Sequence, residues 1–500
     1  MLRRNVVFNY LGQFYISLMG ICIFPLYLRY IGEEAYGLIG FFVLLQTWML
    51  LFDLGMSPTL SRQVAITNAN NDFDFLRKLM RSLESVFFFI ALIIMLLMAI
   101  FCNDIAQKWL TVKNLNIDEV AVCIAIMGGV VSLRWFTSLY KSGINGYEKQ
   151  AWLNVVNIFI VTLRLPASLL LFIYFSKSLI IYFVYQLIIS IVELFIYNRK
   201  MYRCLPKRLN DNHKIYLISW DILKSVLPFA AGTAYTAGIW VLLTQLDKLL
   251  LSKVLTLSNF GFFSLVATLV GGILMLSSPV SNAILPRITV LVSQGKIDQV
   301  VGLYTRCTRF VCCVIFPIAM VMICYPYQVI YGWTGNDVTA KWAVNVLPLY
   351  SLGNALLAVI GFQYYLQYAY GKLKLHIIYN TVLAIVSIPA VSFFAIRYAA
   401  IGTGIVWIAI NSITLLFWTY IVHNKFLKGV HFRWLFQDVL FPALISAMII
   451  FIISNNIDTT SQSRIENMLF VSLVSFTTII ISLFVSFFTD IMSFFKGMVK

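Results

Sequence analysis

The chain is 500 residues long, and its 37 Lys and Arg against 20 Asp and Glu give it a net charge of +17. Only 11% of its residues are charged and 61% are hydrophobic, whereas ordinary globular chains hold roughly 45–50% apolar and about 25% charged residues. This composition excludes a water-soluble enzyme, a disordered regulator and a secreted disulfide scaffold, because the surplus apolar surface needs a bilayer as its solvent.

Apolar runs long enough to cross a bilayer recur along the whole chain. Runs of roughly 17–25 residues between charged or turn-rich breaks predict about 14 transmembrane helices. They cover 6–28, 37–60, 84–103, 119–140, 152–174, 179–197, 222–247, 260–284, 306–330, 342–366, 377–396, 401–421, 438–454 and 468–489. The predicted fold class is therefore an all-α polytopic membrane protein, whose loops are too short to form a separate domain.

Cations are unevenly shared between alternate loops. With the N-terminus inside, the inner loops and tails hold roughly 25 Lys and Arg and the outer loops roughly 9, in agreement with the positive-inside rule. Both termini are therefore predicted to be cytoplasmic. Because the cations are spread over many short loops, they form no single basic face, which argues against a nucleic-acid partner.

A polar break near the middle of the chain suggests its domain organisation. Residues 1–197 are expected to form a six-helix bundle, 198–221 a cytoplasmic linker, 222–421 a second six-helix bundle, and 422–500 two additional spans. Two units of six crossings would share one orientation and be related by an axis along the membrane normal.

A weak internal repeat supports two related bundles. Its two copies read Tyr36-Gly37-Leu38-Ile39 and Phe260-Gly261-Phe262-Phe263, followed by Ser57-Pro58 with Arg62 and by Ser278-Pro279 with Arg287. Chance similarity between apolar helices remains the alternative, because the offset between the copies drifts along the chain.

Sequence motifs typical of soluble enzymes are missing from the chain. It contains no Gly-x-x-x-x-Gly-Lys-Ser/Thr loop, no His-Glu-x-x-His and no paired-Cys metal spacing. The four histidines are scattered beside inner loops, and the eight cysteines lie mostly within spans, where packing explains them. We therefore expect a protein that is not an enzyme and that uses neither a metal nor another cofactor.

Ionisable residues inside the spans are expected to have a structural or functional role, because inserting each one into the bilayer costs roughly 2.5–3.5 kcal/mol. Arg164 is predicted to lie roughly 18 Å deep, near the midplane, either as a cation facing a polar cavity or as half of a structural ion pair. Arg134 is predicted roughly 9–10 Å from the inner end of its span, where snorkelling is an equal alternative. Asp53 and Glu193 are candidate coupling groups or structural counter-ions.

Uncharged polar residues gather in the same half of the chain. They include Gln46, Asn154, Asn157 and Gln186. Hydrogen bonds between helices explain most residues of this kind. Their concentration beside the two arginines is also what a water-filled cavity for a sugar requires.

Several segments resemble the O-antigen and polysaccharide flippases. The resemblance rests on Phe24-Pro25-Leu26-Tyr27-Leu28-Arg29-Tyr30-Ile31-Gly32-Glu33-Glu34-Ala35-Tyr36-Gly37, Asp53-Leu54-Gly55-Met56 with Arg62, Leu246-Asp247-Lys248, Phe260-Gly261-Phe262-Phe263 and Leu285-Pro286-Arg287. That family belongs to the multidrug, oligosaccharidyl-lipid and polysaccharide exporter superfamily. The resemblance implies two six-helix bundles around a central cavity, alternating access, and two C-terminal spans outside a twelve-helix core.

The resemblance also implies a function and a partner. It predicts a flippase of the bacterial inner membrane that moves an undecaprenyl-pyrophosphate-linked oligosaccharide, an O-antigen unit of lipopolysaccharide or a capsule repeat unit, to the outer leaflet. Other polysaccharide assembly proteins are candidate partners. A cation-coupled multidrug exporter of the same superfamily is the alternative, and a membrane-embedded polysaccharide polymerase or ligase is a third reading.

Four arginines form the predicted substrate site. Arg164 and Arg134 would receive the pyrophosphate inside the cavity, with Arg62 and Arg287 at its inner mouth. A bidentate guanidinium fits a pair of phosphate oxygens better than the point charge of a lysine does.

Overall fold

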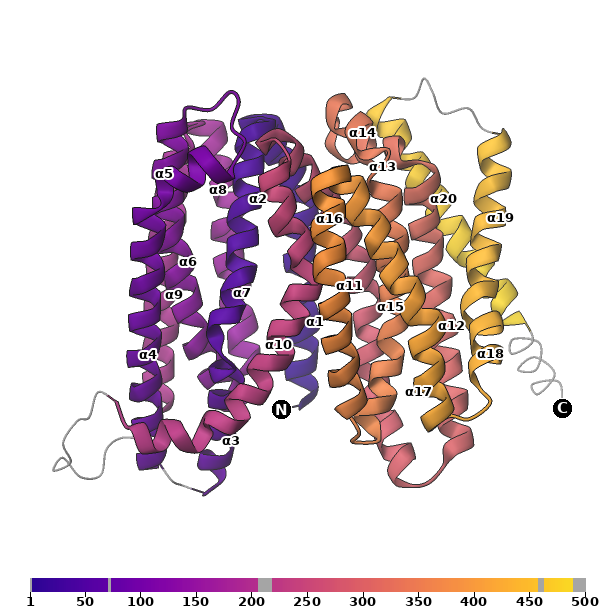
Figure 1. Cartoon of the computed structure of the whole chain (residues 1–500), viewed down its shortest axis with the longest axis horizontal. Coiled ribbons are helices and arrows are strands. Elements are labelled where there is room, and N and C mark those ends of the chain that lie inside the picture. The colour runs from indigo at the N-terminus through magenta and orange to yellow at the C-terminus, as the bar shows by residue number, and fades with distance from the viewer. Residues whose placement is uncertain (1, 71–72, 206–217, 457–462, 489–500) are drawn as a thin grey trace. The chain divides into compact units, whose positions relative to one another are not determined.

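The computed structural model describes residues 2–70, 73–205, 218–456 and 463–488 (Figure 1). Regular secondary structure in these ranges is helical, and a single isolated bridge joins Thr111 to Thr256. The predicted all-α fold is confirmed. Much of the predicted linker, 206–217, and the last residues, 489–500, lie outside the described ranges.

The chain packs as two units, Met1–Gly261 and Phe262–Lys500, each described by itself here. The first contains α1 (Leu2–Ile31), α2 (Glu33–Trp48), the 3-10 turn η1 (Met49–Asp53), α3 (Met56–Asn70), α4 (Phe73–Ile100), α5 (Cys102–Asp104), the π-turn η2 (Ile105–Trp109), α6 (Ile117–Gly146), α7 (Gln150–Arg164), α8 (Pro166–Tyr174), α9 (Leu179–Cys204), α10 (Trp220–Val254) and the start of α11 (Leu257–Ser293).

The second unit holds the rest of α11. It continues with α12 (Ile297–Cys324), α13 (Pro326–Thr334), α14 (Asp337–Ala343), α15 (Leu347–Ala369), α16 (Lys374–Ile413), the π-turn η3 (Thr414–Trp418), α17 (Thr419–Phe426), α18 (His431–Arg433), the π-turn η4 (Trp434–Leu440), α19 (Phe441–Asn456) and α20 (Arg464–Ser486). The predicted domain boundaries at 198–221 and 422 remain predictions.

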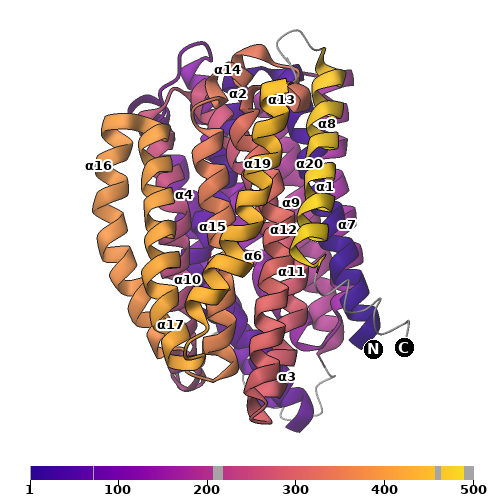
Figure 2. The same cartoon turned by 90° about the vertical axis from the view of Figure 1, so that its right-hand side faces the viewer.

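Thirteen helical runs of the described chain are long and apolar enough to cross a membrane, which makes this a multi-pass membrane protein. One of them, Lys374–Phe426, has 53 residues and would be about 80 Å long if it were straight, more than twice the bilayer core. The chain reverses inside it at Ala399, where φ is 49° and ψ is −135°. Figure 2 shows α16 as two antiparallel arms, which correspond to the predicted spans 377–396 and 401–421.

Apolar side chains on the outer face of the helices identify the lipid-facing surface. On α4, Phe87 is buried and stacks on Trp135 of α6, with ring centroids 4.3 Å apart. On the opposite face of the same helix, Phe89, Ile93 and Leu96 are at least half exposed. Burying the first face and exposing the second suits a helix that has protein on one side and acyl chains on the other.

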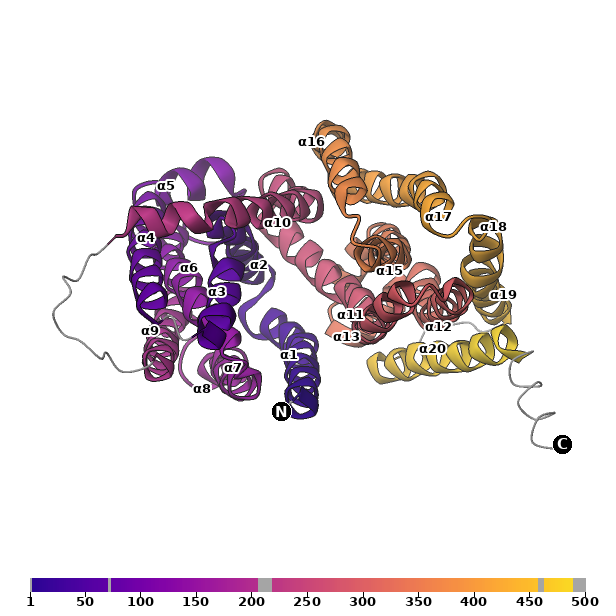
Figure 3. The same cartoon turned by 90° about the horizontal axis from the view of Figure 1, so that it is seen from below.

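Helix α12 lies at the centre of the second unit. It packs against α15, α19 and α20, and Figure 3 shows these helices around it. The two C-terminal spans are therefore packed directly on α12.

Two glycines of the predicted repeat meet where α2 crosses the start of α11. A Cβ added to Gly37 would collide with the carbonyl oxygen of Leu257. A Cβ added to Gly261 would lie 2.9 Å from the carbonyl oxygen of Glu33 and 2.9 Å from the amide nitrogen of Gly37. Small residues are what let two membrane helices approach this closely.

Two helices extend further into polar sequence than hydropathy predicts. Helix α6 continues to Gly146, so Arg134 lies twelve residues, about 18 Å, from the end of the helix, and the predicted end at residue 140 is six residues too early. Helix α12 begins at Ile297, nine residues before the predicted span 306–330, and Arg309 lies within it. In these extended helices, Lys141 of α6 pairs with Glu193, and Arg309 of α12 pairs with Asp438. A hydropathy average does not include such partners, because it counts each charged residue by itself.

Candidate functional site

A cavity of about 980 Å³ opens within the first unit. Residues from α2, η1, α3, α6, α7, α9 and α10 line it. Its polar and charged lining residues are Gln46, Asp53, Ser57, Ser61, Arg62, Arg134, Ser138, Lys141, Ser142, Asn145, Glu148, Arg164 and Glu193. The structure therefore brings five of the predicted site residues, Asp53, Arg62, Arg134, Arg164 and Glu193, to one cavity.

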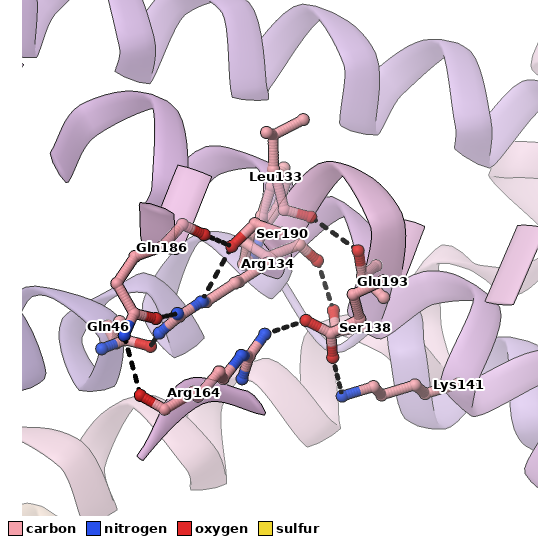
Figure 4. A network of polar contacts seen from close by, with 11 residues as sticks. Gln46, Leu133, Arg134, Ser138, Lys141, Arg164, Gln186, Ser190 and Glu193 are labelled. Carbon is pink, nitrogen blue, oxygen red and sulfur yellow. Dashed lines mark hydrogen bonds and ion pairs between the residues drawn. The ribbon is translucent and has the colours of Figure 1, made fainter. Parts of the chain in front are cut away.

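A break in the fifth span positions Arg164. Helix α7 ends at this residue and α8 begins at Pro166, which has no N–H and disfavours helical geometry for the residue before it. Arg164 lies fourteen residues after the start of α7, about 21 Å along the helix, deep in the span. The break turns the guanidinium toward α9, into the polar cluster shown in Figure 4.

The backbone carbonyls that this break exposes are satisfied by side chains. Tyr185 donates to the carbonyl of Leu163 at 2.9 Å, and Gln186 Nε2 donates to that of Arg164 at 2.9 Å. The hydroxyl of Tyr27 donates to the carbonyl of Leu165 at 2.9 Å. Broken helices are tolerated at membrane depth when neighbouring side chains satisfy the freed backbone groups in this way.

Glu193 of α9 is buried and lies between two cations. Its Oε2 accepts from Arg164 Nη2, and its Oε1 lies 2.8 Å from Lys141 Nζ. The side chain of Glu193 is 1% exposed, whereas those of Arg164 and Lys141 are 17% and 34% exposed. One buried carboxylate thus faces two basic groups, and Arg164 Nε has no hydrogen-bond partner among the described residues.

Arg134 of α6 is held by neutral acceptors. Its Nη1 donates to Gln46 Oε1 at 2.7 Å, its Nη2 to Gln186 Oε1 at 2.5 Å and its Nε to Ser190 Oγ at 3.1 Å. Its guanidinium carbon also lies 5.1 Å from the ring centroid of Phe42. These partners fix its direction but leave its charge uncompensated, and a fixed cation of this kind attracts an anion.

Asp53 and Arg62 line a different part of the cavity wall. Asp53, at the end of η1, accepts from the hydroxyl and the amide N–H of Ser57. The guanidinium of Arg62 in α3 lies over Phe229, 4.8 Å from the ring centroid. Arg287 belongs to the second unit and lines another cavity there.

The cavity has a positive centre. Its lining includes the four cations Arg62, Arg134, Lys141 and Arg164 and the three carboxylates Asp53, Glu148 and Glu193. In the inner cluster, Arg164 and Lys141 share Glu193, and Arg134 adds a third cation that is held by neutral groups. Among the described residues, no group of three or more His, Cys, Asp or Glu side chains is arranged to hold a metal ion. The arrangement suits an anionic group that accepts from guanidinium donors.

Sequence reasoning missed Lys141, which hydropathy assigned to a loop. A helical spacing could have identified it. Arg134, Ser138 and Lys141 lie at i, i+4 and i+7 on α6, and Gln186, Ser190 and Glu193 have the same spacing on α9. Each set lies on one face of its helix, and the two faces oppose each other, because α6 and α9 pack together.

Solved structures show the same fold. The lipid II flippase MurJ, in an inward closed conformation, has a TM-score of 0.74 at 16% identity, over 97% of this chain and 100% of that one. An inward-facing multidrug resistance MATE family transporter of the MOP superfamily has a TM-score of 0.63 at 13% identity, over 83% of this chain and 96% of that one.

Sequence comparisons cover the first unit and beyond. A protein of Shigella flexneri named "Putative O-antigen transporter" is 19% identical over 422 residues, which are 83% of this chain and 97% of that protein. The family model described as polysaccharide biosynthesis protein matches residues 2–292, more than half of the chain. The chain therefore belongs to the polysaccharide biosynthesis protein family.

Proposed function

We propose that this protein is a flippase for a lipid-linked oligosaccharide. The carrier is undecaprenyl pyrophosphate, the glycan is an O-antigen or capsule repeat unit, and transport by alternating access runs from the inner to the outer leaflet of the bacterial cytoplasmic membrane. The observation that carries the proposal is the deep cation Arg134, whose hydrogen-bond partners among the described residues are the neutral side chains of Gln46, Gln186 and Ser190.

The chemistry of the cavity matches the three parts of such a substrate. The pyrophosphate needs cations, which Arg134, Arg164 and Lys141 supply. The glycan needs polar surroundings, and Gln46 and Ser138 belong to the same lining. The polyprenyl chain can stay in the bilayer, so the protein needs to enclose only the polar head.

The membrane potential can supply the energy. Outward movement of an anionic headgroup is driven by an inside-negative potential and gains about 2.3 kcal/mol per charge per 100 mV. Because the positive-inside rule predicts both termini on the cytoplasmic side, the end of the first unit where α6 and α9 finish would face the cytoplasm.

The relatives support this choice over a drug exporter. One relative is named as an O-antigen transporter and a similar structure as a lipid II flippase, both of which concern lipid-linked glycans. A cation-coupled exporter would require deep carboxylates in a cavity poor in arginine. Here the deep carboxylate, Glu193, is already shared by Arg164 and Lys141.

A cell-based experiment tests the proposal. Deleting the gene should remove surface polysaccharide while lipid-linked repeat units accumulate on the inner leaflet. Wild type should restore export, Arg134→Gln should not, and Arg397→Gln should, because Arg397 is exposed and outside the cavity lining. If the deletion strain delivers single repeat units to the outer leaflet but does not polymerise them, the protein is a polymerase and the proposal is wrong.

A further inference from the structure

The second unit contains a basic cavity of its own, with a volume of about 1170 Å³. It lies at one end of that unit, where α12 and α18 begin and where α17 and α20 finish. Its charged lining residues are the bases Arg287, Arg306, Arg309, Lys428 and Arg433 and the acids Asp298 and Asp438. The flippase proposal does not use this cavity.

Two of these charged lining residues, Arg309 and Asp438, form an ion pair. Arg309 Nε and Nη2 each lie 2.7 Å from Asp438 Oδ1, and Arg309 Nη1 donates to the backbone carbonyl of Ser486 at 3.2 Å. The side chain of Asp438 is 2% exposed. These contacts connect α12 to η4 and to the end of α20. The charges of Arg309 and Asp438 cancel each other.

Apart from that pair, the lining contains four bases and one carboxylate, Asp298. Arg287, Arg306, Lys428 and Arg433 are all solvent-exposed. Arg433 Nε donates to the neutral Gln437 at 3.1 Å. The lining therefore keeps a surplus of positive charge after the internal pair is set aside.

A tight turn brings one of these bases to the cavity. Lys428 precedes Gly429, whose φ is +79°, in the short connection from α17 to α18. Glycine adopts this left-handed conformation at no steric cost. The turn lets α18 start beside α12, so that Arg433 and Arg306, which come from different helices, line the same cavity.

The same lining contains apolar side chains that are open to the surroundings. Phe436, Phe441 and Val485 line the cavity and are 60%, 45% and 39% exposed. They lie on spans that cross the membrane or directly beside one. The cavity thus combines a cationic part with an apolar side, which matches an amphiphile and not a free inorganic anion.

We propose that this cavity binds the phosphate headgroup of an anionic phospholipid from the leaflet at that face. Arg306, Lys428 and Arg433 contact the headgroup, and an acyl chain lies along Phe436 and Phe441. The site needs neither a glycan nor a polyprenyl chain, so it is separate from the transport substrate. A lipid held there would brace the turn between α17 and α18 against α12.

Lipid titration of the purified full-length protein tests the site. Dioleoyl phosphatidylglycerol, dioleoyl phosphatidylcholine and inorganic phosphate are titrated separately, with bound lipid counted by native mass spectrometry and stability followed by thermal unfolding. Phosphatidylglycerol should remain bound and raise the unfolding temperature, and the other two should not. Arg306→Gln with Arg433→Gln should weaken phosphatidylglycerol binding by about tenfold or more, because each basic residue near a membrane surface contributes about fivefold.

A matched variant controls for general loss of charge. Lys372→Gln with Lys374→Gln removes two exposed cations, one in the turn before α16 and one at its first residue, that do not line the cavity. This segment lies near the same end of the unit, because Tyr370 donates to the carbonyl of Phe426, the last residue of α17, at 3.3 Å. The control should bind phosphatidylglycerol like wild type.

Three results would overturn the proposal: equal binding of phosphatidylcholine, equal loss in the control, or competition by inorganic phosphate at matched concentration. The last would assign a free-anion site. Should the double variant not fold, Lys428→Gln in the exposed turn is measured instead and should weaken binding by about fivefold; unchanged binding in that variant would also contradict the proposal.

Discussion

Arg134 donates from Nη2 to the amide oxygen of Gln186 at 2.5 Å, so the deep cation of α6 is oriented by a neutral group. The same amide donates through its nitrogen to the carbonyl of Arg164 at 2.9 Å. One glutamine therefore orders both arginines without cancelling either charge. Because Gln186 orients the arginines but carries no charge, a substitution at this position can change the net charge of the site while keeping its geometry.

Changing Gln186 to glutamate tests that charge with almost no change in shape. The carboxylate would still accept from Arg134 but would neutralise it. We expect Gln186→Glu to insert normally and to lose at least about tenfold in export, because the anionic substrate then meets less positive charge. Arg134→Gln should have the same effect, and Arg134→Lys should keep part of the activity. Normal export by Gln186→Glu would show that Arg134 has only a structural role.

Substitutions in the ion cluster of Glu193, Arg164 and Lys141 can distinguish a role in stability from a role in transport. Glu193→Gln leaves Arg164 and Lys141 facing each other without a counter-charge, and we expect a loss of about 3–5 kcal/mol in stability. Stability is measured by thermal or denaturant unfolding in detergent.

Removing the whole cluster completes that test. In Lys141→Met/Arg164→Met/Glu193→Leu both partners of Glu193 are removed together with it, so stability should return to near the wild-type level. If the cluster serves the substrate, this triple variant stays folded and does not export. Export at the wild-type rate would instead identify Arg164 and Glu193 as a purely structural pair.

The crossing of α2 and α11 is expected to tolerate no added side chain. Gly37→Ala places a methyl group against the carbonyl of Leu257, and Gly261→Ala places one 2.9 Å from that of Glu33. Each should lower stability by about 1–3 kcal/mol, because the helices have to separate. Gly232→Ala in α10, where an added Cβ has no heavy atom within 4 Å, is the matched control and should be neutral or slightly stabilising. Equal effects at all three positions would contradict a close crossing.

Cysteine labelling tests the orientation. In a background without the native cysteines, Lys341→Cys should react with an impermeant reagent added from outside, and Lys200→Cys and Lys372→Cys should not. The side chain of Lys341 is 71% exposed, so a missing reaction there could not be attributed to burial. Reaction at position 200 from the outside would invert the proposed topology.

Depth along a helix could be counted from the sequence, but the direction of a side chain could not. Residue counting placed Arg164 deep in its span, and the structure has it fourteen residues from the start of α7. Its partner was left open between Asp53 and Glu193, because the choice depends on how α7 and α9 rotate about their axes. The structure pairs it with Glu193, whereas Asp53 binds Ser57.

Errors in the span boundaries have a related cause. Hydropathy ends a helix at a charged residue, and Lys141 therefore appeared to lie in a loop. In the fold, Glu193 lies 2.8 Å from it and lets α6 continue to Gly146. A prediction from one segment at a time cannot include a partner that is fifty-two residues away.

The reversal at Ala399 has a consequence for how the protein is made. The two arms of α16 meet with no polar loop between them, and Arg397 is the one charged residue in the twelve positions on either side of the reversal. Neither arm can rest in water while the other is inserted, because almost its entire length is apolar. We therefore expect the two arms to enter the bilayer as a pair in one step, and a long hydrophilic insertion at this point to split that step into two.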